Sequence, residues 1–493
     1  MNIQKFKIKE IALALCLLTS TIALSQVGIG TAHPDPSSLL DLKSNSQGLL
    51  APRMTTLERT TIVSPAESLL VFDTNEKSFY FYNTTNASWT KLANDMSSAK
   101  RNNYKLIKSV TDLATELVAG GGSSYKLDQN TYYEINGRIN LAHPIELNDA
   151  YVSGLDANED MLSATGTVFK GNKGGSIKNV TLKGAKAFDI TGPGTASNST
   201  LLIQNTIIEG MTSSVGNIGN LGLVFSNIVN FINNNNGITY SSIGNLLLNN
   251  QAWMDNNQGT YEKFTGTFGL IEKVSGFSTV KGSAVALDVS TNGLIVITGV
   301  LQGTVFSGTS SAPYVNGYTT GSYPGYNFSN AWSVAAPGIP RESDDVSTGD
   351  INLSAPVGSG ATTTFSGTGS GSRKKIEGTT TSNNLFRFKK EENNRIIYQG
   401  NKPRFFQLAA SISFQTSSDS FTAILYIAKN GVVIDQTKVY GRGSSSIFTP
   451  SDILALPIIG SVELKKSDYI EVWAERNSGI GNMETLSLNL TVR

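Results

Sequence analysis

Short apolar runs recur between about residues 125 and 310, and several of them contain one asparagine in the middle. The asparagines lie 26, 22 and 18 residues apart and are Asn179, Asn205, Asn227 and Asn245. Coils of a parallel β-helix differ in length through loop insertions, and stacked asparagines can hydrogen-bond along such a stack. Because asparagine is unfavourable in an ordinary strand, the pattern favours a right-handed parallel β-helix. A β-sandwich with asparagines in its turns is the alternative.

One segment before these runs has a helical pattern instead. Val110, Leu113 and Leu117 fall on one helical face, and three glycines from Gly120 to Gly122 follow as a stop signal. We therefore expect a single short amphipathic helix at the start of the β-helix. It is well placed to cover the first coil, whose exposed strand edges would otherwise promote aggregation.

The last part of the chain, residues 376–493, has the alternation typical of half-buried antiparallel strands. Asn430-Gly431 separates two strand-like runs and favours a two-residue type I′ hairpin. The run at 421–428 is apolar on both faces, which indicates a central strand of a sandwich or a strand buried against another subunit. In the second case, Ile424 and Tyr426 would be buried between the copies of a homotrimer.

Changes in composition along the 493 residues predict several domains. Residues 346–375 are rich in Gly, Ser and Thr, which is typical of a flexible linker, and 357–372 is its most cleavable part. The expected segments are a signal peptide at 1–25, a small β-rich module at 26–95, a parallel β-helix at 96–345, this linker, and a β domain at 376–493.

The first 25 residues have the features of a signal peptide. Lys5, Lys7 and Lys9 form a basic start, an apolar core follows, and Ala23-Leu24-Ser25 fits a cleavage site. We expect export, a mature chain that starts at Gln26, and a secreted or cell-surface location. No other window is long and apolar enough to span a membrane, so no transmembrane segment is expected.

Composition limits the chemistry that the mature chain can perform. Cys16, inside the leader, is the only cysteine, which excludes disulfides and cysteine sites after cleavage. The net charge is +1 and charged residues make up 16% of the chain, so the composition lacks the excess of basic residues typical of nucleic-acid binding. His33 and His143 are each followed by proline and form no metal-binding pair, so we expect neither a metal nor another cofactor. The 48 glycines favour strands joined by turns.

The N-terminal part of the chain resembles a known module. Residues 27–42 (VGIGTAHPDPSSLLDL), 48–62 (GLLAPRMTTLERTTI) and 69–89 (LLVFDTNEKSFYFYNTTNASW) together resemble the N-terminal module of Bacteroidetes surface and secreted proteins. They are also similar to segments of phage tail-fibre proteins. The resemblance implies a lineage and a surface location rather than a chemistry. Within it, the apolar runs on either side of residues 75–77 predict a β-hairpin.

The C-terminal part resembles the trimeric jelly-roll domains of the C1q/tumour-necrosis-factor type, and also those at the ends of phage fibres. The residues that carry the resemblance are 394–414 (NRIIYQGNKPRFFQLAASISF), 425–431 (LYIAKNG) and 464–474 (LKKSDYIEVWA). It implies an antiparallel jelly roll and a homotrimer, and it does not identify a ligand.

Two acidic turns are candidates for catalysis. Asp156, Glu159 and Asp160 lie together near the start of the β-helix, where carboxylates could act as the acid and base of a polysaccharide lyase or hydrolase. The alternative is a solvated turn whose side chains cap backbone groups. No basic partner lies beside this first cluster. Asp344 and Asp345 form a similar acidic turn in linker-like sequence.

Aromatic residues crowd a Gly- and Ser-rich stretch from Tyr314 to Trp332. Aromatic rings stack on the apolar faces of sugars, while serine and asparagine supply hydrogen bonds. We select Tyr323, Tyr326 and Trp332 as candidates for glycan binding. The alternative is that these rings pack the loop onto the last coils of the solenoid.

These inferences predict an all-β chain: a small β-rich N-terminal module, a right-handed parallel β-helix and an antiparallel jelly-roll domain. The predicted function is an extracellular, fibre-like surface or secreted protein, a homotrimeric adhesin that binds a glycan or another surface component. Two alternatives are a β-helix depolymerase that uses Asp156, Glu159 or Asp160, and a purely structural filament subunit.

Overall fold

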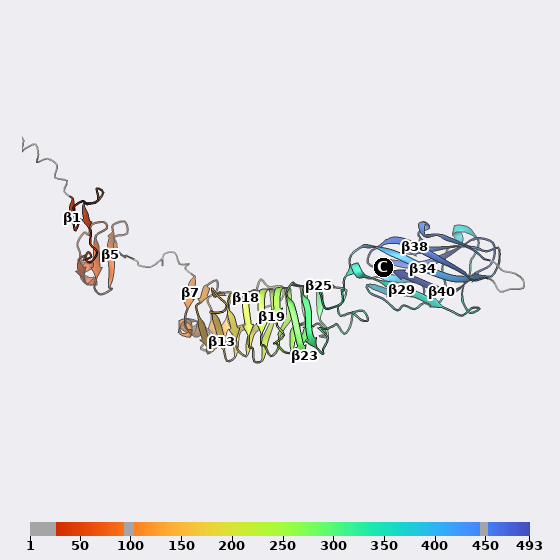
Figure 1. Cartoon of the computed structure of the whole chain (residues 1–493), viewed down its shortest axis with the longest axis horizontal. Coiled ribbons are helices and arrows are strands. Elements are labelled where there is room, and N and C mark those ends of the chain that lie inside the picture. Colours follow the sequence, from red (N-terminus) through yellow and green to blue (C-terminus); the bar gives the residue numbers. More distant parts are fainter. Residues whose placement is uncertain (1–25, 93–102, 444–451) are drawn as a thin grey trace, which may run out of the picture. The chain divides into compact units, whose positions relative to one another are not determined.

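The computed structural model of the chain describes residues 26–92, 103–443 and 452–493 (Figure 1). The chain divides into two compact units, residues 1–101 and 102–493, which we describe separately. The expected signal peptide at 1–25, and the boundary expected at residues 95 and 96, lie outside the described residues. No helix in the described ranges is long and apolar enough to cross a membrane.

Residues 26–92, the described part of the first unit, form two small sheets and one short helix. Arg59, on the helix, pairs with Asp73 at 2.9 Å and lies 3.8 Å from the centre of the Tyr80 ring, which holds the helix on the larger sheet. The hairpin predicted around residues 75–77 is confirmed. The elements are β1 (Val27–Ile29) paired with β2 (Leu40–Leu42), the sheet of β3 (Arg53–Met54), β4 (Leu70–Asp73), β5 (Ser78–Asn83) and β6 (Ser88–Lys91), and α2 (Thr56–Thr60).

The second unit begins with a parallel β-solenoid of about nine turns, which confirms the predicted parallel β-helix. Its strands form three faces. Face 1 contains β7 (Tyr104–Ile107), β9 (Tyr132–Ile135), β12 (Tyr151–Ser153), β15 (Gly175–Lys178), β22 (Thr267–Val274), β25 (Ile295–Gln302) and β28 (Trp332–Ala335). Face 2 contains β8 (Tyr125–Lys126), β11 (Ile145–Glu146), β14 (Thr167–Gly171), β17 (Lys186–Thr191), β21 (Thr260–Thr265), β24 (Val285–Asp288) and β27 (Val315–Asn316). Face 3 contains β10 (Arg138–Leu141), β13 (Met161–Ala164), β16 (Thr181–Lys183), β23 (Phe277–Gly282) and β26 (Val305–Ser310).

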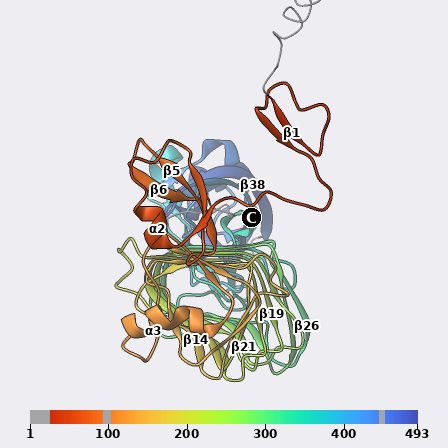
Figure 2. The same ribbon diagram turned by 90° about the vertical axis from the view of Figure 1, so that its left-hand side faces the viewer.

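Three long strands continue around the corners between faces: β18 (Thr200–Glu209), β19 (Ser214–Ile232) and β20 (Ile238–Trp253). Figure 2 looks along the solenoid and shows its coils stacked behind one another. Inward side chains of successive coils lie in columns, one of which contains Leu201, Val224, Leu246 and Ile271. All four are fully buried. Burying such a side chain contributes about 1.5–3 kcal/mol, so these columns form the core of the solenoid.

The corner between face 1 and face 3 explains part of the asparagine pattern. Asn179 and Asn205 have left-handed φ values of 53° and 47°, and the Asn205 amide donates to the Asn179 side-chain oxygen at 3.1 Å. Asparagine tolerates this conformation better than most residues. The other two asparagines, which were expected in the same stack, do not belong to it. Asn227 precedes the corner by one position, and Asn245 lies at the start of face 1. The positions that continue this corner are Ile228, Asn250, Ser275 and Gly303.

The predicted helix lies at the start of the solenoid, as a 3-10 turn η2 (Val110–Leu113) followed by α3 (Ala114–Ala119). Leu113 is part of the solenoid core, and Val110 and Leu117 pack against that core. Glu116 is buried beneath the helix, where it pairs with Lys105 at 2.6 Å. The apolar side of this short helical segment therefore contacts the first coil.

The chain ends in a sandwich of two antiparallel sheets around a second core. The first sheet has the order β29 (Gly349–Ser354), β40 (Met483–Val492), β34 (Arg404–Thr416), β38 (Leu454–Leu464), and β30 (Ala361–Thr363) also pairs with β40. The second has the order β32 (Phe388–Lys390), β33 (Ile396–Tyr398), β39 (Tyr469–Ser478), β35 (Thr422–Lys429), β36 (Val432–Val433), with β31 (Lys374–Lys375) beside β39 and β37 (Val439–Arg442) beside β35. Positive φ values at Asn430 and Gly431 confirm the predicted type I′ hairpin.

The segment expected to be a flexible linker, residues 346–375, is instead part of the sandwich. β29, β30 and β31 all lie in it and pair with β40 or β39. The short helical turn η4 (Gly369–Ser372) lies against β39, where the Ser372 hydroxyl donates to the Arg476 carbonyl at 3.2 Å. Glycine and serine are typical of flexible linkers, but they also fit closely packed turns and edge strands.

The same segment explains why β35 is apolar on both faces. Ile424 and Tyr426, expected between subunits, are only 3% and 1% exposed within one chain. The Arg373 guanidinium lies 4.8 Å from the centre of the Tyr426 ring, and the Tyr426 hydroxyl donates to Glu475 at 2.8 Å. The expectation of a subunit interface at these two residues is therefore wrong, because their own chain covers them.

Candidate functional site

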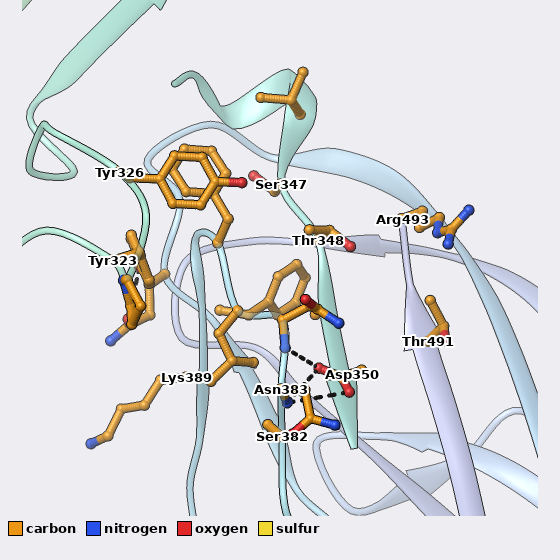
Figure 3. Close-up of a pocket in the computed structure, with 18 of the residues that line it drawn as sticks. Tyr323, Tyr326, Ser347, Thr348, Asp350, Ser382, Asn383, Lys389, Thr491 and Arg493 are labelled. Atoms are coloured by element: carbon orange, nitrogen blue, oxygen red, sulfur yellow. Dashed lines mark hydrogen bonds between the residues drawn. The ribbon is translucent and has the colours of Figure 1, made fainter. Parts of the chain in front are cut away.

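A pocket of about 990 Å³ lies where the last loop of the solenoid meets the sandwich (Figure 3). Its walls come from the loop after β27, the segment that leads into β29, the loop before β32, and the ends of β34 and β40. Aromatic, polar and charged side chains in its lining are Tyr323, Tyr326, Asp345, Asp350, Ser382, Asn383, Lys389, Arg404, Asn489, Thr491 and Arg493.

Two aromatic residues selected from the sequence, Tyr323 and Tyr326, line this pocket. The Tyr326 ring stacks on Phe386 with 4.0 Å between the ring centres, and Tyr323 contacts the same ring edge-on at 5.4 Å. The Tyr323 hydroxyl donates to Gln399 at 3.0 Å. Burial raises the pKa of both tyrosines, so their hydroxyls remain protonated at neutral pH. Both rings are held in fixed positions and are partly exposed.

Asp350 shapes the opposite wall. Its carboxylate accepts the backbone N–H groups of Asn383 and Asn384, at 3.1 and 2.7 Å, and also accepts from the Asn352 side chain (Figure 3). These bonds fix the loop that carries Ser382. The Ser382 hydroxyl is buried without a hydrogen-bond partner in the described chain, so one polar group in this wall is unsatisfied.

The pocket contains more cationic than anionic groups: Lys389, Arg404 and Arg493 against Asp345 and Asp350. Partial burial alone would raise the pKa of Asp345, but the Ser343 hydroxyl and the Arg341 guanidinium outweigh this and lower it. Both carboxylates already have partners. Among the described residues, the Arg493 side chain has no hydrogen bond or ion pair, so its guanidinium is available to an anion.

The third aromatic candidate, Trp332, is not in the pocket. It is 2% exposed and lies inside the last coil, where it stacks on Phe264 at 6.4 Å and donates its indole N–H to Tyr318 at 3.0 Å. Gly299, the neighbour of Trp332 in the coil below, leaves room for the indole, since a Cβ there would lie 2.3 Å from it. Trp332 is a core residue, as is its neighbour Phe328, and the partly buried Tyr318 packs against the same core.

The acidic candidates lie on the loop between β12 and β13. Asp160 is buried, and its carboxylate accepts the backbone N–H groups of Gly137, Leu155 and Asp156 at 2.7, 2.7 and 3.1 Å. Asp156 is exposed and caps the Asn158 N–H at 2.8 Å, and Glu159 is exposed. Asp160 thus holds the loop together. In the part of the chain that the structure describes, no group of three or more His, Cys, Asp or Glu could hold a metal ion.

The second acidic turn joins the solenoid to the sandwich. Asp344 accepts the backbone N–H groups of Asn401 and Lys402 at 2.8 and 2.9 Å. Arg387, which is 1% exposed, donates to the Asn330 side chain at 2.9 Å and to the Trp332 carbonyl at 2.6 Å. These contacts link the loop that carries the tyrosines to the sandwich and position the pocket between them.

Sequence reasoning missed the residues that complete the pocket, chiefly Asp350, Arg404 and Arg493. They lie on β29, β34 and at the end of β40, strands that are far apart in the sequence and join one sheet. No spacing rule connects them. The only available signal was the acidic and aromatic richness of the segment before residue 350.

Comparison with known proteins adds one local match. Residues 28–107 match the family model described as the phage tail like trimerisation region. This match covers residues 28–92 of the described first unit and ends at Ile107, the last residue of β7. No curated protein matches this chain.

Two solved structures are similar in part. The enzymatically active domain of tailspike protein 4 of bacteriophage CBA120 is 9% identical, with 90% of this chain and 77% of that chain covered, at a TM-score of 0.18. The corresponding domain of tailspike protein 2 of the same phage is 11% identical, with 84% and 83% covered, at a TM-score of 0.16. At these TM-scores the likeness carries no argument about activity.

Proposed function

We propose that this protein is an extracellular, fibre-like trimer that binds an acidic glycan in the pocket beside Tyr326. The observation that carries the proposal is the presence, in one pocket, of a partly exposed stacked tyrosine and of Arg493, whose guanidinium has no partner among the described residues. A pocket of about 990 Å³ falls within the usual size of small-ligand sites.

The chemistry of the pocket suits a sugar that carries a carboxylate or sulfate group. The face of Tyr326 turned away from Phe386 is available for an apolar sugar face. Arg493 can form two parallel hydrogen bonds to a planar anionic group. Asn383, Asn489 and Thr491 add amide and hydroxyl groups for the ring hydroxyls.

The trimer is supported by the family match over residues 28–107 and by the surface of the first unit. The β1–β2 pair is parallel, two-stranded and largely exposed, and such an isolated ribbon is marginally stable in water. Large apolar side chains of this unit lie in solvent, among them Leu39 at 81%, Leu50 at 77% and Val63 at 88% exposure. Contact with other copies would cover this surface.

Export, cell-surface location and Bacteroidetes origin belong to the same proposal, and they rest on the leader and on the resemblance of the N-terminal module. The proposal also includes a C1q/tumour-necrosis-factor-like identity for the sandwich. Two antiparallel sheets with a core between them are compatible with that family.

Binding is favoured over depolymerisation because of the state of the carboxylates. A glycosidase needs one carboxyl group with a raised pKa as its general acid. In the pocket, the pKa of Asp345 is lowered and Asp350 accepts backbone hydrogen bonds. Asp160 is likewise bonded to three backbone N–H groups. None of these three groups is arranged as such an acid.

The proposal predicts that binding depends on Tyr326 and Arg493 rather than on Asp156 or Glu159. Mature protein should be applied to an array of neutral, carboxylated and sulfated oligosaccharides, with release of reducing ends measured on the same compounds. We expect retention of acidic sugars only. Tyr326→Ala should weaken binding about two- to tenfold, since one aromatic contact is worth about 0.5–1.5 kcal/mol. Arg493→Gln should abolish the preference for acidic over neutral sugars.

Matched variants separate the contacts from the fold. Tyr326→Phe keeps the ring and Arg493→Lys keeps the charge, so both should retain most of the affinity. Asp156→Asn and Glu159→Gln should bind like the wild type. Oligosaccharide cleavage that disappears in Asp156→Asn or Glu159→Gln would overturn the binding proposal in favour of the depolymerase. Wild-type affinity in Tyr326→Ala would exclude the pocket as the binding site.

A further inference from the structure

The three faces of the solenoid differ in their outward side chains, and face 1 carries an apolar row. Leu202, Phe225 and Leu247 lie one above another on β18, β19 and β20, with Leu223 beside them, and all are partly exposed. In these three coils, the outward rows of face 1 contain no Lys, Arg, Asp or Glu. We call Leu202, Leu223, Phe225 and Leu247 the face 1 stripe.

Face 2 has the polar surface expected of a solvated solenoid, and face 3 is mixed. On face 2 the outward row includes Asp189, Asn217, Thr239 and Lys263, and Lys263 pairs with Asp288 at 3.3 Å. On face 3, Lys183 pairs with Glu209 at 3.0 Å. Face 3 also carries the partly exposed Ile207 and Ile232, whereas the outward row of face 2 in these coils is polar.

Ile228, at the corner next to this stripe, provides an independent observation. It has a left-handed φ of 55° although it is β-branched, and it is 46% exposed. A left-handed conformation costs such a residue about 1–2 kcal/mol. The equivalent corner positions in the coils on either side are Asn205 and Asn250, which suit this conformation. An exposed isoleucine in a strained conformation does not stabilise the isolated solenoid. We therefore take it as a sign of a contact with another molecule.

We propose that the face 1 stripe and Ile228 contact a second copy of this chain and face the three-fold axis of the trimer. This inference rests on the trimer of the proposed function. The match to a trimerisation region in the same chain supports a second copy of this chain as the partner of this surface. Near a three-fold axis each side chain meets its own copies, and like charges would repel. The stripe itself carries no charge, and Lys178 and Glu272 border it in the coils on either side.

Cysteine cross-linking tests the contact directly. Cys16 is the only cysteine and lies in the expected leader, so a chain starting at Gln26 has no thiol of its own. Phe225→Cys should give a covalent dimer with a short bismaleimide on a denaturing gel. Asn217→Cys, exposed on face 2 of the same coil, is the matched control and should stay monomeric. Light scattering establishes the trimer in each sample.

Ile228→Asn is a second test, in which two measurements should move in opposite directions. Relief of the left-handed strain should raise the unfolding temperature, while loss of the isoleucine contact in each copy should raise the concentration for half-dissociation about tenfold or more.

A trimer with no cross-link at Phe225→Cys, or with equal cross-linking at Asn217→Cys, would overturn the face 1 contact and leave the trimer standing. A wild-type monomer would overturn both. An Ile228→Asn protein with unchanged assembly would also contradict the inference.

Discussion

A buried ion pair inside the solenoid allows a sharp test of how its core is stabilised. Lys273 Nζ lies 3.0 Å from Glu262 Oε1, and both side chains are at most 2% exposed. The ammonium also lies 5.1 Å from the centre of the Tyr261 ring. The second carboxylate oxygen of Glu262 has no hydrogen-bond partner among the described residues. The desolvation cost of this pair is therefore incompletely offset.

Both residues interrupt apolar columns. Lys273 lies between Leu248 and Leu301 in successive coils. Glu262 lies in the same way between two apolar neighbours, Ile238 and Leu287. Leucine at both positions would continue each column without a charge.

The two single substitutions should lower the stability of the protein, whereas the double substitution should not. Lys273→Leu or Glu262→Leu alone leaves one buried charge without its partner, which should lower the free energy of unfolding by about 3–5 kcal/mol. The double variant Glu262→Leu/Lys273→Leu removes both charges and should be unchanged or more stable by about 1–4 kcal/mol. Urea denaturation followed by tryptophan fluorescence and circular dichroism measures all four proteins.

The pH dependence checks the same reasoning. Burial raises the pKa of Glu262 above its ordinary value of 4.5, and Lys273 offsets this only in part. A carboxyl group with a raised folded pKa binds its proton more tightly when folded. Its contribution to stability is thus present below pH 4.5 and is lost as the pH rises toward the folded pKa. The wild type should lose stability relative to the double variant over this window.

One result would refute this account. The free energy of unfolding of the double variant could instead fall by about 6–10 kcal/mol, which is the sum of the two single costs. In that case the ion pair contributes net stability and the columns do not accept leucine. If the difference in free energy of unfolding between the wild type and the double variant does not change across this pH window, Glu262 is not the group that titrates.

Two further predictions concern residues whose roles the structure reassigns. Trp332→Ala should lower the free energy of unfolding by about 3–5 kcal/mol, because it removes a buried indole, whereas Ile295→Ala at an exposed position should have little effect in the same denaturation assay. Asp160→Asn should cost about 1.5–3 kcal/mol through its backbone hydrogen bonds, while Asp156→Asn should change stability by about 0.5 kcal/mol or less; equal losses in the two variants would contradict the role of Asp160 in the loop.

The solenoid was predictable from its sequence because its corners and columns impose a local pattern. The expected stacking of asparagines is confirmed for Asn179 and Asn205, which hydrogen-bond to each other, and asparagine suits their left-handed corner. The pattern failed at Asn227 because the corner position of that coil is taken by Ile228, one residue later. Sequence spacing does not show which of two adjacent residues turns the corner, since coil pairing decides this.

The sandwich and the pocket were predictable only in part. Asn430-Gly431 correctly predicted one hairpin, because the conformation of a two-residue turn depends on the residues in the turn itself. The burial of Tyr426 depends on Arg373, 53 residues away, and was misread as a subunit contact. Similarly, Tyr323 and Tyr326 stood out by residue type, whereas Arg493 joins them only through the pairing of β40 with β29 and β34.

The repeated left-handed corner has a consequence for how the length of this protein can evolve. The corners at Asn205, Ile228 and Asn250 mark equivalent points of consecutive coils, so the chain between two of them is one interchangeable unit. Duplication or loss of such a unit would lengthen or shorten the solenoid while keeping every column in register. Glu262 and Lys273 set a limit, because an insertion between them would separate two charges that must stay together.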